Sequence, residues 1–508
     1  MAKKTSVSST AVKRTRRRKP VNAHAAAMPE ALLDFMMEGW KPQTSALPKP
    51  LPAAADHARR REALSRLFPG EALVIPTGHE QVRANDTNFR FRPGSDFFYL
   101  TGNMEPDCVL VMLPEKKGHR SVLFAEPNPG RSDATFFTDR NKGELWVGPR
   151  LGVEESRARF AVDEARGLPE LPAFLRSLKR EGRFRTLRGL SPHVDRALPE
   201  RKAEDTALAA ALSELRLIKD RREIAELTAA VRSTARGFED VIRSLPHAPS
   251  ERHVEGTFAL RARVEGNDVG YGIIAAAGAN ACVLHWTRND GPIKPDELLL
   301  LDAGVEGNSL YTADITRTVP IGGRFNPEQR EIYTLVLEAQ RAAFAAVKPG
   351  NDFMEPNRRA MQVLAKGLER LGILEDAEVA LQDTQQLYRR YSLHNVSHML
   401  GLDVHDCAKA RQETYRYGKL QPGMVLTVEP GLYFQKDDLT VPKRYRGIGV
   451  RIEDDLLVTA RGYRNLSGFI PTEPDEVEAW MARLWAEDGS HAPAGKATSR
   501  RAKTRVGR

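Results

Sequence analysis

Cysteine is scarce in this sequence. The 508 residues include only three, Cys108, Cys282 and Cys407, which lie far apart and form no CxxC pair. This usage argues against a disulfide framework and a thiolate metal site, and it is typical of a reducing compartment. Long apolar runs are also missing, since none approaches the roughly 18 residues that a membrane-spanning helix needs. We therefore expect a cytoplasmic protein without a membrane segment.

Negative charge is absent from both ends of the chain. Residues 1–20 carry eight Lys and Arg, and residues 491–508 carry six more, with no acid in either stretch. Because the whole chain has a net charge of +10, the remaining body has a net charge of about −4. We expect two basic, disordered tails, residues 1–55 with a Pro-rich linker and residues 486–508. There are two alternatives. The tails bind weakly to nucleic acid or acidic partners, or the amino-terminal tail is an organelle transit peptide.

The body of the chain is long enough for more than one domain, with 41% hydrophobic and 28% charged residues overall. Its first part holds the strand-like runs EALVIP, DFFYLTG, DCVLVML and SVLFA. The helical patterns EESRARFAVDEARGL and LPELPAFLRSLKREG follow them. This mixture predicts an α/β amino-terminal domain over residues 56–217.

The second part, residues 218–485, follows a different pattern. Residues 213–244 predict one long charged helix at its start. A clear helix is also predicted from Asn326, because Asn326, Pro327 and Gln329 supply an N-cap, an N1 proline and a capping box. The runs LLLLDAGVEGNSLYTADITRTVP, VLTVEPGLYF and GIGVRIEDDLLVT read as strands with turns. We predict an α+β domain whose helices cover an antiparallel-rich sheet.

Four acids stand inside or at the end of hydrophobic strand runs. Asp302 ends LLLL, Asp314 precedes ITRTVP, and Glu429 and Glu453 stand in VLTVEPG and GVRIED. An ionised carboxylate in such a strand is costly unless a positive group meets it. One such acid is usually structural, capping a turn or pairing with an arginine. Four in the same half of the chain together require cations.

Histidines are the second sign of a metal site. His394, His398 and His405 fall in HNVSHMLGLDVHD, and His285 lies in VLHWT on an apolar strand, where a lone histidine is more often a packed core residue. A zinc site of the HExxH kind does not fit, because no Glu follows His394 and Gly401 interrupts a helix.

The chemistry of four carboxylates with one imidazole favours Mn²⁺, Mg²⁺ or Fe²⁺ over a structural zinc. Two divalent cations balance four carboxylates, acidify a bridging water and stabilise a developing oxyanion. The remaining histidines can then move protons or hold a substrate carbonyl. The residues therefore predict a dinuclear metallohydrolase.

At these residues the sequence resembles the aminopeptidase P family of the pita-bread metallopeptidases, over roughly residues 56–485. The motifs stand in the family's order: LHWT, LDAG, DITRTVP, SHMLGLDVHD, LTVEPGLY and YRGIGVRIEDD. FRPGSDFFYLTGNMEPDCVLVML resembles the family's amino-terminal domain, which methionine aminopeptidases lack. The resemblance implies an α/β amino-terminal domain followed by an α+β pita-bread catalytic domain.

The resemblance also implies which residues bind metal. The ligands would be Asp302, Asp314, His398, Glu429 and Glu453, with Asp314 and Glu453 bridging two ions. Asp302 would bind one ion, and His398 with Glu429 would bind the other. Glu429 would also accept a proton from the bridging water.

Further residues are implied to act around the metals. His285, His394 and His405 would line the substrate site, with His405 near the scissile carbonyl, and Arg451 would orient the acidic shell. Tyr433, and Trp146 from the first domain of a neighbouring subunit, are weaker candidates.

The implied reaction is removal of an N-terminal residue whose next residue is proline, with two Mn²⁺ ions and a bridging hydroxide as nucleophile. Proline lacks an N–H and has a fixed φ, so such peptides need a dedicated pocket. A homo-oligomer, either dimer or tetramer, is also implied.

The chain departs from the family in two places. Asn395 stands where Gly is usual, and Asp302 and Asp314 are one residue further apart than in the family.

Three alternatives remain. A prolidase, which acts on Xaa-Pro dipeptides, shares the ligands, but the amino-terminal motifs favour the aminopeptidase. A non-catalytic peptide- or histone-binding protein of this fold is the alternative from another class. Such relatives typically lose ligands, and all five are present here. The intact acidic set likewise disfavours a creatinase-like amidinohydrolase.

Overall fold

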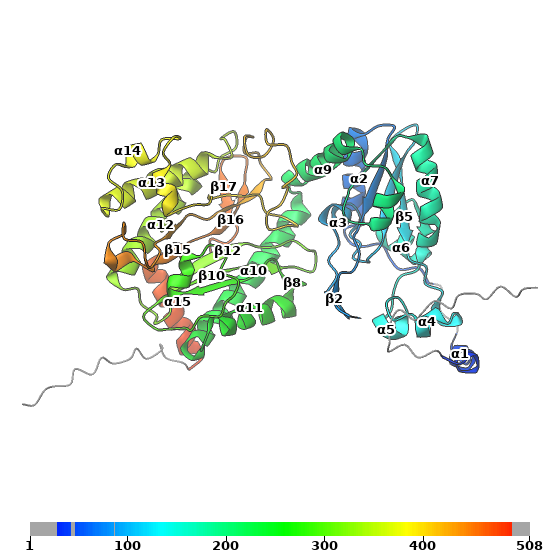
Figure 1. Ribbon diagram of the computed structural model, residues 1–508, viewed down its shortest axis with the longest axis horizontal. Coiled ribbons are helices and arrows are strands. Elements are labelled where there is room, and N and C mark those ends of the chain that lie inside the picture. The colour runs from blue at the N-terminus through cyan, green and yellow to red at the C-terminus, as the bar shows by residue number, and fades with distance from the viewer. Residues whose placement is uncertain (1–27, 42–45, 86, 490–508) are drawn as a thin grey trace, which may run out of the picture. The chain divides into compact units, whose positions relative to one another are not determined.

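The computed structural model describes residues 28–41, 46–85 and 87–489 (Figure 1). Most of the tails predicted to be disordered, residues 1–27, 42–45 and 490–508, lies outside these residues, but the described Glu30–Met37 forms a helix, so disorder is wrong there. Contacts divide the chain into two compact units. The first holds residues up to Ala58, Val74–Phe184 and Arg188–Pro199, and the second holds Arg59–Leu73, Arg185–Leu187 and the chain from Glu200 onward. Over the part of the chain that is described, none of the helices combines the length and apolar character required to cross a bilayer.

The first half of the chain is built around a five-stranded mixed sheet of order β6-β5-β4-β1-β7. β5 pairs antiparallel with β4 and parallel with β6. The runs EALVIP, DCVLVML and SVLFA form β1, β4 and β5 as predicted, and their apolar residues are buried on both faces of the sheet. The elements in order are α1 (Glu30–Met37), α2 (Ala54–Leu67), β1 (Ala72–Pro76), β2 (Val82–Ala84), β3 (Thr87–Asn88), α3 (Ser95–Thr101), β4 (Val109–Pro114), β5 (His119–Ala125), α4 (Thr135–Thr138), α5 (Glu144–Val147), α6 (Val153–Phe160), β6 (Glu164–Gly167), α7 (Leu171–Glu181), β7 (Phe184–Thr186), α8 (Pro192–Ala197) and α9 (Lys202–Leu217).

The run DFFYLTG forms helix α3, so the strand predicted there is wrong. Residues Phe97 to Thr101 are all buried, and a short continuous apolar run looks the same in a buried strand and a buried helix. Gly102, with φ of 68°, ends the helix in the left-handed conformation that favours glycine. The helix predicted over EESRARFAVDEARGL is also too long, because it stops at Phe160 and the chain continues as β6.

The single long helix predicted over residues 213–244 is two helices, α9 and α10 (Arg221–Ser244). The break falls at Ile218 and Lys219. Asp220 then caps α10 by accepting hydrogen bonds from the backbone N–H groups of Arg222 and Glu223. A strong capping box inside a charged stretch therefore outweighed the helical periodicity.

The second unit has an antiparallel-rich core, as predicted. One sheet has the order β12-β10-β9, a second has the order β13-β16-β17, and β14 pairs with β15. The elements are α11 (Glu251–Glu265), β8 (Asp268–Val269), β9 (Ile274–Ala277), β10 (Leu298–Ala303), β11 (Val305–Glu306), β12 (Ile315–Pro320), α12 (Pro327–Ala346), α13 (Glu355–Arg370), α14 (Ala377–Ala380), β13 (Val425–Val428), β14 (Gly431–Tyr433), β15 (Gly449–Arg451), β16 (Asp454–Val458), β17 (Tyr463–Asn465) and α15 (Pro474–Glu487).

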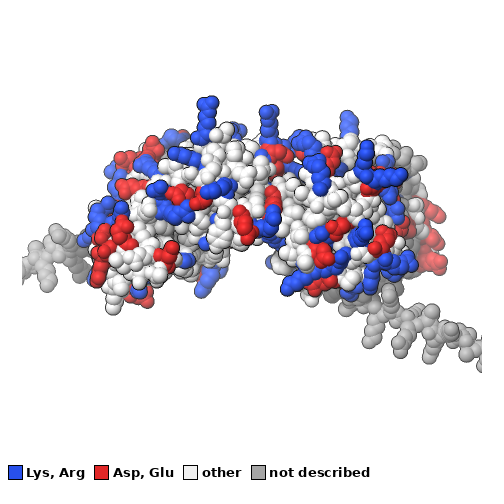
Figure 2. All heavy atoms as spheres, turned by 90° about the horizontal axis from the view of Figure 1, so that it is seen from above, with Lys and Arg blue, Asp and Glu red and all other residues white. Residues whose placement is uncertain are grey.

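Helices cover the strands of this unit (Figure 1). α12 packs on β13, β14 and β15, and α13 lies against α12, whereas α10 and α11 contact β11, β8 and β9. The helix predicted from Asn326 is confirmed as α12, with the Asn326 side chain accepting from the N–H of Gln329 at 2.8 Å. Basic and acidic side chains lie interspersed over the face seen in Figure 2, so the described residues there present no stripe of one sign for a nucleic acid.

Candidate metal centre

The four predicted acids come from the ends of different strands. Asp302 lies near the end of β10, Asp314 directly precedes β12, Glu429 follows β13, and Glu453 joins β15 to β16. Asp302 pairs in register with Thr316 of β12, and the N–H of Glu453 donates to the Thr316 carbonyl at 3.1 Å. The antiparallel pairing therefore brings together carboxylates that are up to about 150 residues apart in sequence.

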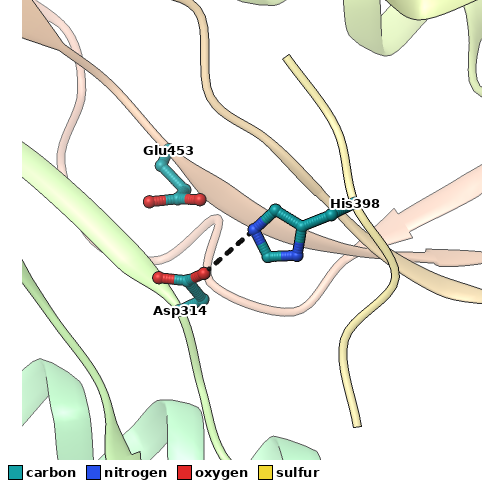
Figure 3. A group of neighbouring side chains, drawn as sticks. All are labelled: Asp314, His398 and Glu453. Carbon is teal, nitrogen blue, oxygen red and sulfur yellow. Dashed lines mark ion pairs between the residues drawn. The ribbon is translucent and has the colours of Figure 1, made fainter. Parts of the chain in front are cut away.

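Asp314, His398 and Glu453 form the tightest group (Figure 3). One ligand atom from each lies within 4.8 Å of the others, and His398 Nε2 is 3.2 Å from Asp314 Oδ2. Both carboxylates are buried. Two acids and one imidazole that converge in this way fit a divalent cation bound by oxygen and nitrogen ligands.

Glu429 and Asp302 lie around this group. Glu429 Oε1 is 3.5 Å from His398 Nε2. Asp302 accepts from Arg451 Nη2 at 2.6 Å and from the Tyr271 hydroxyl at 2.7 Å, and the same hydroxyl interacts with Asp314. Five predicted ligands are thus brought to one place, three in mutual contact range and two at its border.

The pKa values of the cluster are shifted because its side chains are buried and lie close together. Burial and the neighbouring acids raise the pKa of Asp314 and of Glu453 above their usual values. Burial raises the pKa of Glu429 to about 7, against the opposing charges of His398 and Arg451. Burial lowers the pKa of His398, but the hydrogen bond and charge of Asp314 outweigh it and raise that pKa to about 9. Without a cation the cluster holds protons, so a cation can take their place.

The other histidines surround the same group. His394 Nε2 is 2.7 Å from the Tyr433 hydroxyl, and its Nδ1 is 3.5 Å from Glu429 Oε2. Burial and the Arg451 charge lower the pKa of His394 to about 4. The His405 ring meets the His398 ring edge-on, with centroids 4.4 Å apart.

His285 does not lie on a strand, which corrects the prediction. It follows a short 3-10 helix (Gly278–Cys282) in an irregular segment. The buried Glu251 carboxylate holds this segment by accepting hydrogen bonds from the Trp286 indole and the Gly291 N–H, at 2.8 and 2.6 Å. Trp146 lies in α5 of the first unit, where Arg140 stands over its partly exposed ring.

Sequence reasoning missed two residues of the site. The Thr316 hydroxyl donates to Glu453 Oε2 at 2.7 Å and also receives Arg451 Nε at 3.2 Å. Because side chains alternate along a strand, Thr316 shares a face with Asp314, and this periodicity could have found it. Tyr271 carries no such signal, because only the folded chain places its hydroxyl on Asp302.

The two departures from the family pattern bring no loss of ligands. Asn395 does not have a positive φ, so the backbone accepts a side chain there without strain. In the turn between Asp302 and Asp314, Leu310 takes a φ of 63°, and its N–H donates to the Gly307 carbonyl at 2.9 Å.

Comparison with known proteins agrees with this architecture. Residues 57–185 match the model of the aminopeptidase P N-terminal domain, and residues 225–460 match metallopeptidase family M24. These matches lie inside the two domains expected from the sequence. Xaa-Pro aminopeptidase 1 of Streptomyces coelicolor is 50% identical over 459 residues, which is 90% of this chain and 92% of that protein.

Solved structures give the same result. Aminopeptidase P from E. coli with the inhibitor Pro-Leu matches with a TM-score of 0.77 at 32% identity, covering 86% of this chain and 100% of that one. A zinc-substituted E. coli aminopeptidase P in complex with product matches with a TM-score of 0.76 at 33% identity, covering 86% and 99%. The fold is that of a metal-dependent hydrolase. The chain belongs to metallopeptidase family M24, in its Xaa-Pro aminopeptidase group.

Proposed function

We propose that this chain releases the N-terminal residue of peptides whose second residue is proline, using two divalent cations, with Mn²⁺ as the native metal. The observation that carries the proposal is the convergence of Asp314, His398 and Glu453, with Glu429 and Asp302 at the border of the group. Bound cations would supply an acidified water and charge stabilisation for the oxyanion.

The protein's own residues have distinct roles in this proposal. Asp302, Asp314, His398, Glu429 and Glu453 hold the cations. Glu429, which borders the group and contacts His398 and His394, is the acceptor for the proton of the attacking water. Arg451 orients Asp302 through its 2.6 Å contact. His285, His394 and His405 hold the substrate, and His394 stays neutral near pH 7 because its pKa is about 4.

The proposal extends to the setting of the enzyme. Three free, buried cysteines support a cytoplasmic location. We also propose assembly as a dimer or tetramer, as the family resemblance implies, with the exposed Trp146 ring reaching a neighbouring site. We propose residues 56–217 and 218–485 as the functional domains.

Turnover of Ala-Pro-Ala and Ala-Pro by metal-stripped protein, before and after addition of Mn²⁺, tests the proposal. We expect metal-dependent release of alanine from the tripeptide and little from the dipeptide. The reverse preference would make the chain a prolidase. Release from neither peptide, with metal shown to be bound, would overturn the proposed activity.

A further inference from the structure

The segment from His394 to Asp406 carries three site histidines but is neither helix nor strand. Its first part is held by β13. The His398 carbonyl accepts from the Thr427 N–H at 3.0 Å, and the Leu400 N–H donates to the Val425 carbonyl at 3.0 Å. This anchoring fixes His398, and the Gly401 carbonyl, which accepts from the Thr312 N–H at 3.1 Å, holds the chain before the part that carries His405.

A buried ion cluster holds that second part. Asp406 Oδ2 is 3.0 Å from Lys219 Nζ, and Asp406 Oδ1 is 3.3 Å from Arg216 Nη2. The exposed fractions of these side chains are 1%, 0% and 6%. The Asp406 N–H also donates to the Met399 carbonyl at 2.9 Å, which folds the segment back on itself. Two cations on one buried carboxylate make this a firmly oriented anchor.

The shape of the segment depends on this carboxylate. A Cβ at Gly401 would stand 2.2 Å from Asp406 Oδ2 and 3.0 Å from Lys219 Cε, so only glycine leaves room for the pair. Lys219 is itself fixed, because its N–H donates to the Gly423 carbonyl at 2.9 Å at the break between α9 and α10.

His405 has little else to orient it. Among the described residues, none hydrogen-bonds to the His405 ring. The ring contacts the His398 ring edge-on. The placement of the His405 ring therefore follows from the backbone that Asp406 anchors.

We propose that Asp406, clamped by Lys219 and Arg216, is a positioning residue that sets His405 beside the metal centre. The inference rests on the proposed substrate role of His405. Misplacing a group that contacts the substrate by about 1 Å can cost about 100-fold in rate. A buried ion pair is a poor source of stability, so orientation is the better account of this cluster.

A double-mutant cycle tests the inference. Asp406→Asn is measured alone and together with His405→Ala, with kcat, KM, bound metal and melting temperature recorded for each. We expect Asp406→Asn to lower kcat about 10- to 100-fold with bound metal retained. In the His405→Ala background it should lower kcat by less than about two-fold, because its effect passes through His405.

Glu251→Gln is the matched control. Glu251 is a second fully buried carboxylate, and it holds the segment that carries His285 rather than His405. Its effect on kcat should persist in the His405→Ala background and shrink in the His285→Ala background. A general loss of rigidity would make both carboxylate variants behave alike in both backgrounds.

The outcomes are separable. Wild-type turnover tests the proposed function, and His405→Ala alone tests the role of His405. An equal loss of kcat from Asp406→Asn in both backgrounds, an unchanged kcat, or a loss of bound metal would each overturn the positioning role. If Asp406→Asn does not fold, Arg216→Gln, at the more exposed edge of the cluster, enters the same cycle under the same criteria.

Discussion

At the scale of single residues, the proposed chemistry depends on buried carboxylates that crowd one another when no cation is bound. Asp314 and Glu453 are buried beside one another, and their raised pKa values reflect that conflict. Glu429 differs because it borders the group and faces both His398 and His394. A carboxylate placed between two imidazoles at the border of the group is suited to accept and return a proton.

Glu429→Gln tests this role. We expect kcat to fall by about 10²- to 10⁴-fold, because the amide keeps the shape of the side chain but cannot accept the proton. Steady-state kinetics with a proline tripeptide, together with metal analysis, provides the measurement. Glu214→Gln removes a carboxylate that pairs with Arg411 outside the site and should leave kcat unchanged. Near-normal turnover of Glu429→Gln would contradict the assignment.

The metal-free protein should lose stability as pH rises. The pKa of His398 is raised from 6.5 to about 9, so its contribution is complete below pH 6.5 and disappears through pH 9. The pKa of Glu429, raised from 4.5 to about 7, acts in the same direction at lower pH. Thermal melts of metal-free protein should therefore show a lower Tm at pH 9 than at pH 7. His398→Gln should flatten this slope, whereas a Tm that rises with pH would refute the expectation.

At the scale of elements, short local signals decide where helices begin and end. The capping box of α12 sets its start, and the Asp220 box divides a charged stretch into α9 and α10. That division leaves Lys219 outside both helices, where its side chain can reach Asp406. The capping box at Asp220 therefore places Lys219 where it contacts Asp406, beside the metal centre.

Asn326→Ala should reduce the free energy of unfolding by about 1 kcal/mol, because the first turn of α12 loses its side-chain acceptor. Asn326→Gly is the matched control and should cost only a few tenths of a kcal/mol, since glycine leaves the backbone free to be solvated. Urea unfolding gives both values. The kcat of each variant should equal that of wild type, and equal losses of stability would argue against capping as the cause.

At the scale of the whole molecule, bound metal and fold should stabilise one another. The ligands come from strands distant in sequence, so the unfolded chain does not hold them together. Saturating the stripped protein at 100 times the dissociation constant should add about 2.7 kcal/mol to the free energy of unfolding. Calorimetry with increasing Mn²⁺ provides the measurement. A Tm that does not depend on metal concentration would show that the folded chain does not bind the cation in preference to the unfolded chain.

Much of the fold and of the candidate site could be predicted from the sequence, because the signals for them are local. Acids in apolar strands stand out against their neighbours, and Asn326 with Gln329 marks a helix start directly. The same locality explains the errors. DFFYLTG is apolar throughout, and an apolar run carries no periodicity that separates the buried helix α3 from a buried strand.

Residue types and their order along the chain are enough to predict the family, the two-part architecture and the candidate ligands. How the ligands meet follows from the tertiary structure. It turned Asp302 toward Arg451 and Tyr271, and it drew Asp314, His398 and Glu453 into one group. It also placed Lys219 on Asp406, 187 residues further along the chain. Such contacts join residues far apart in sequence, and strand pairing and burial, rather than any local pattern, bring them together.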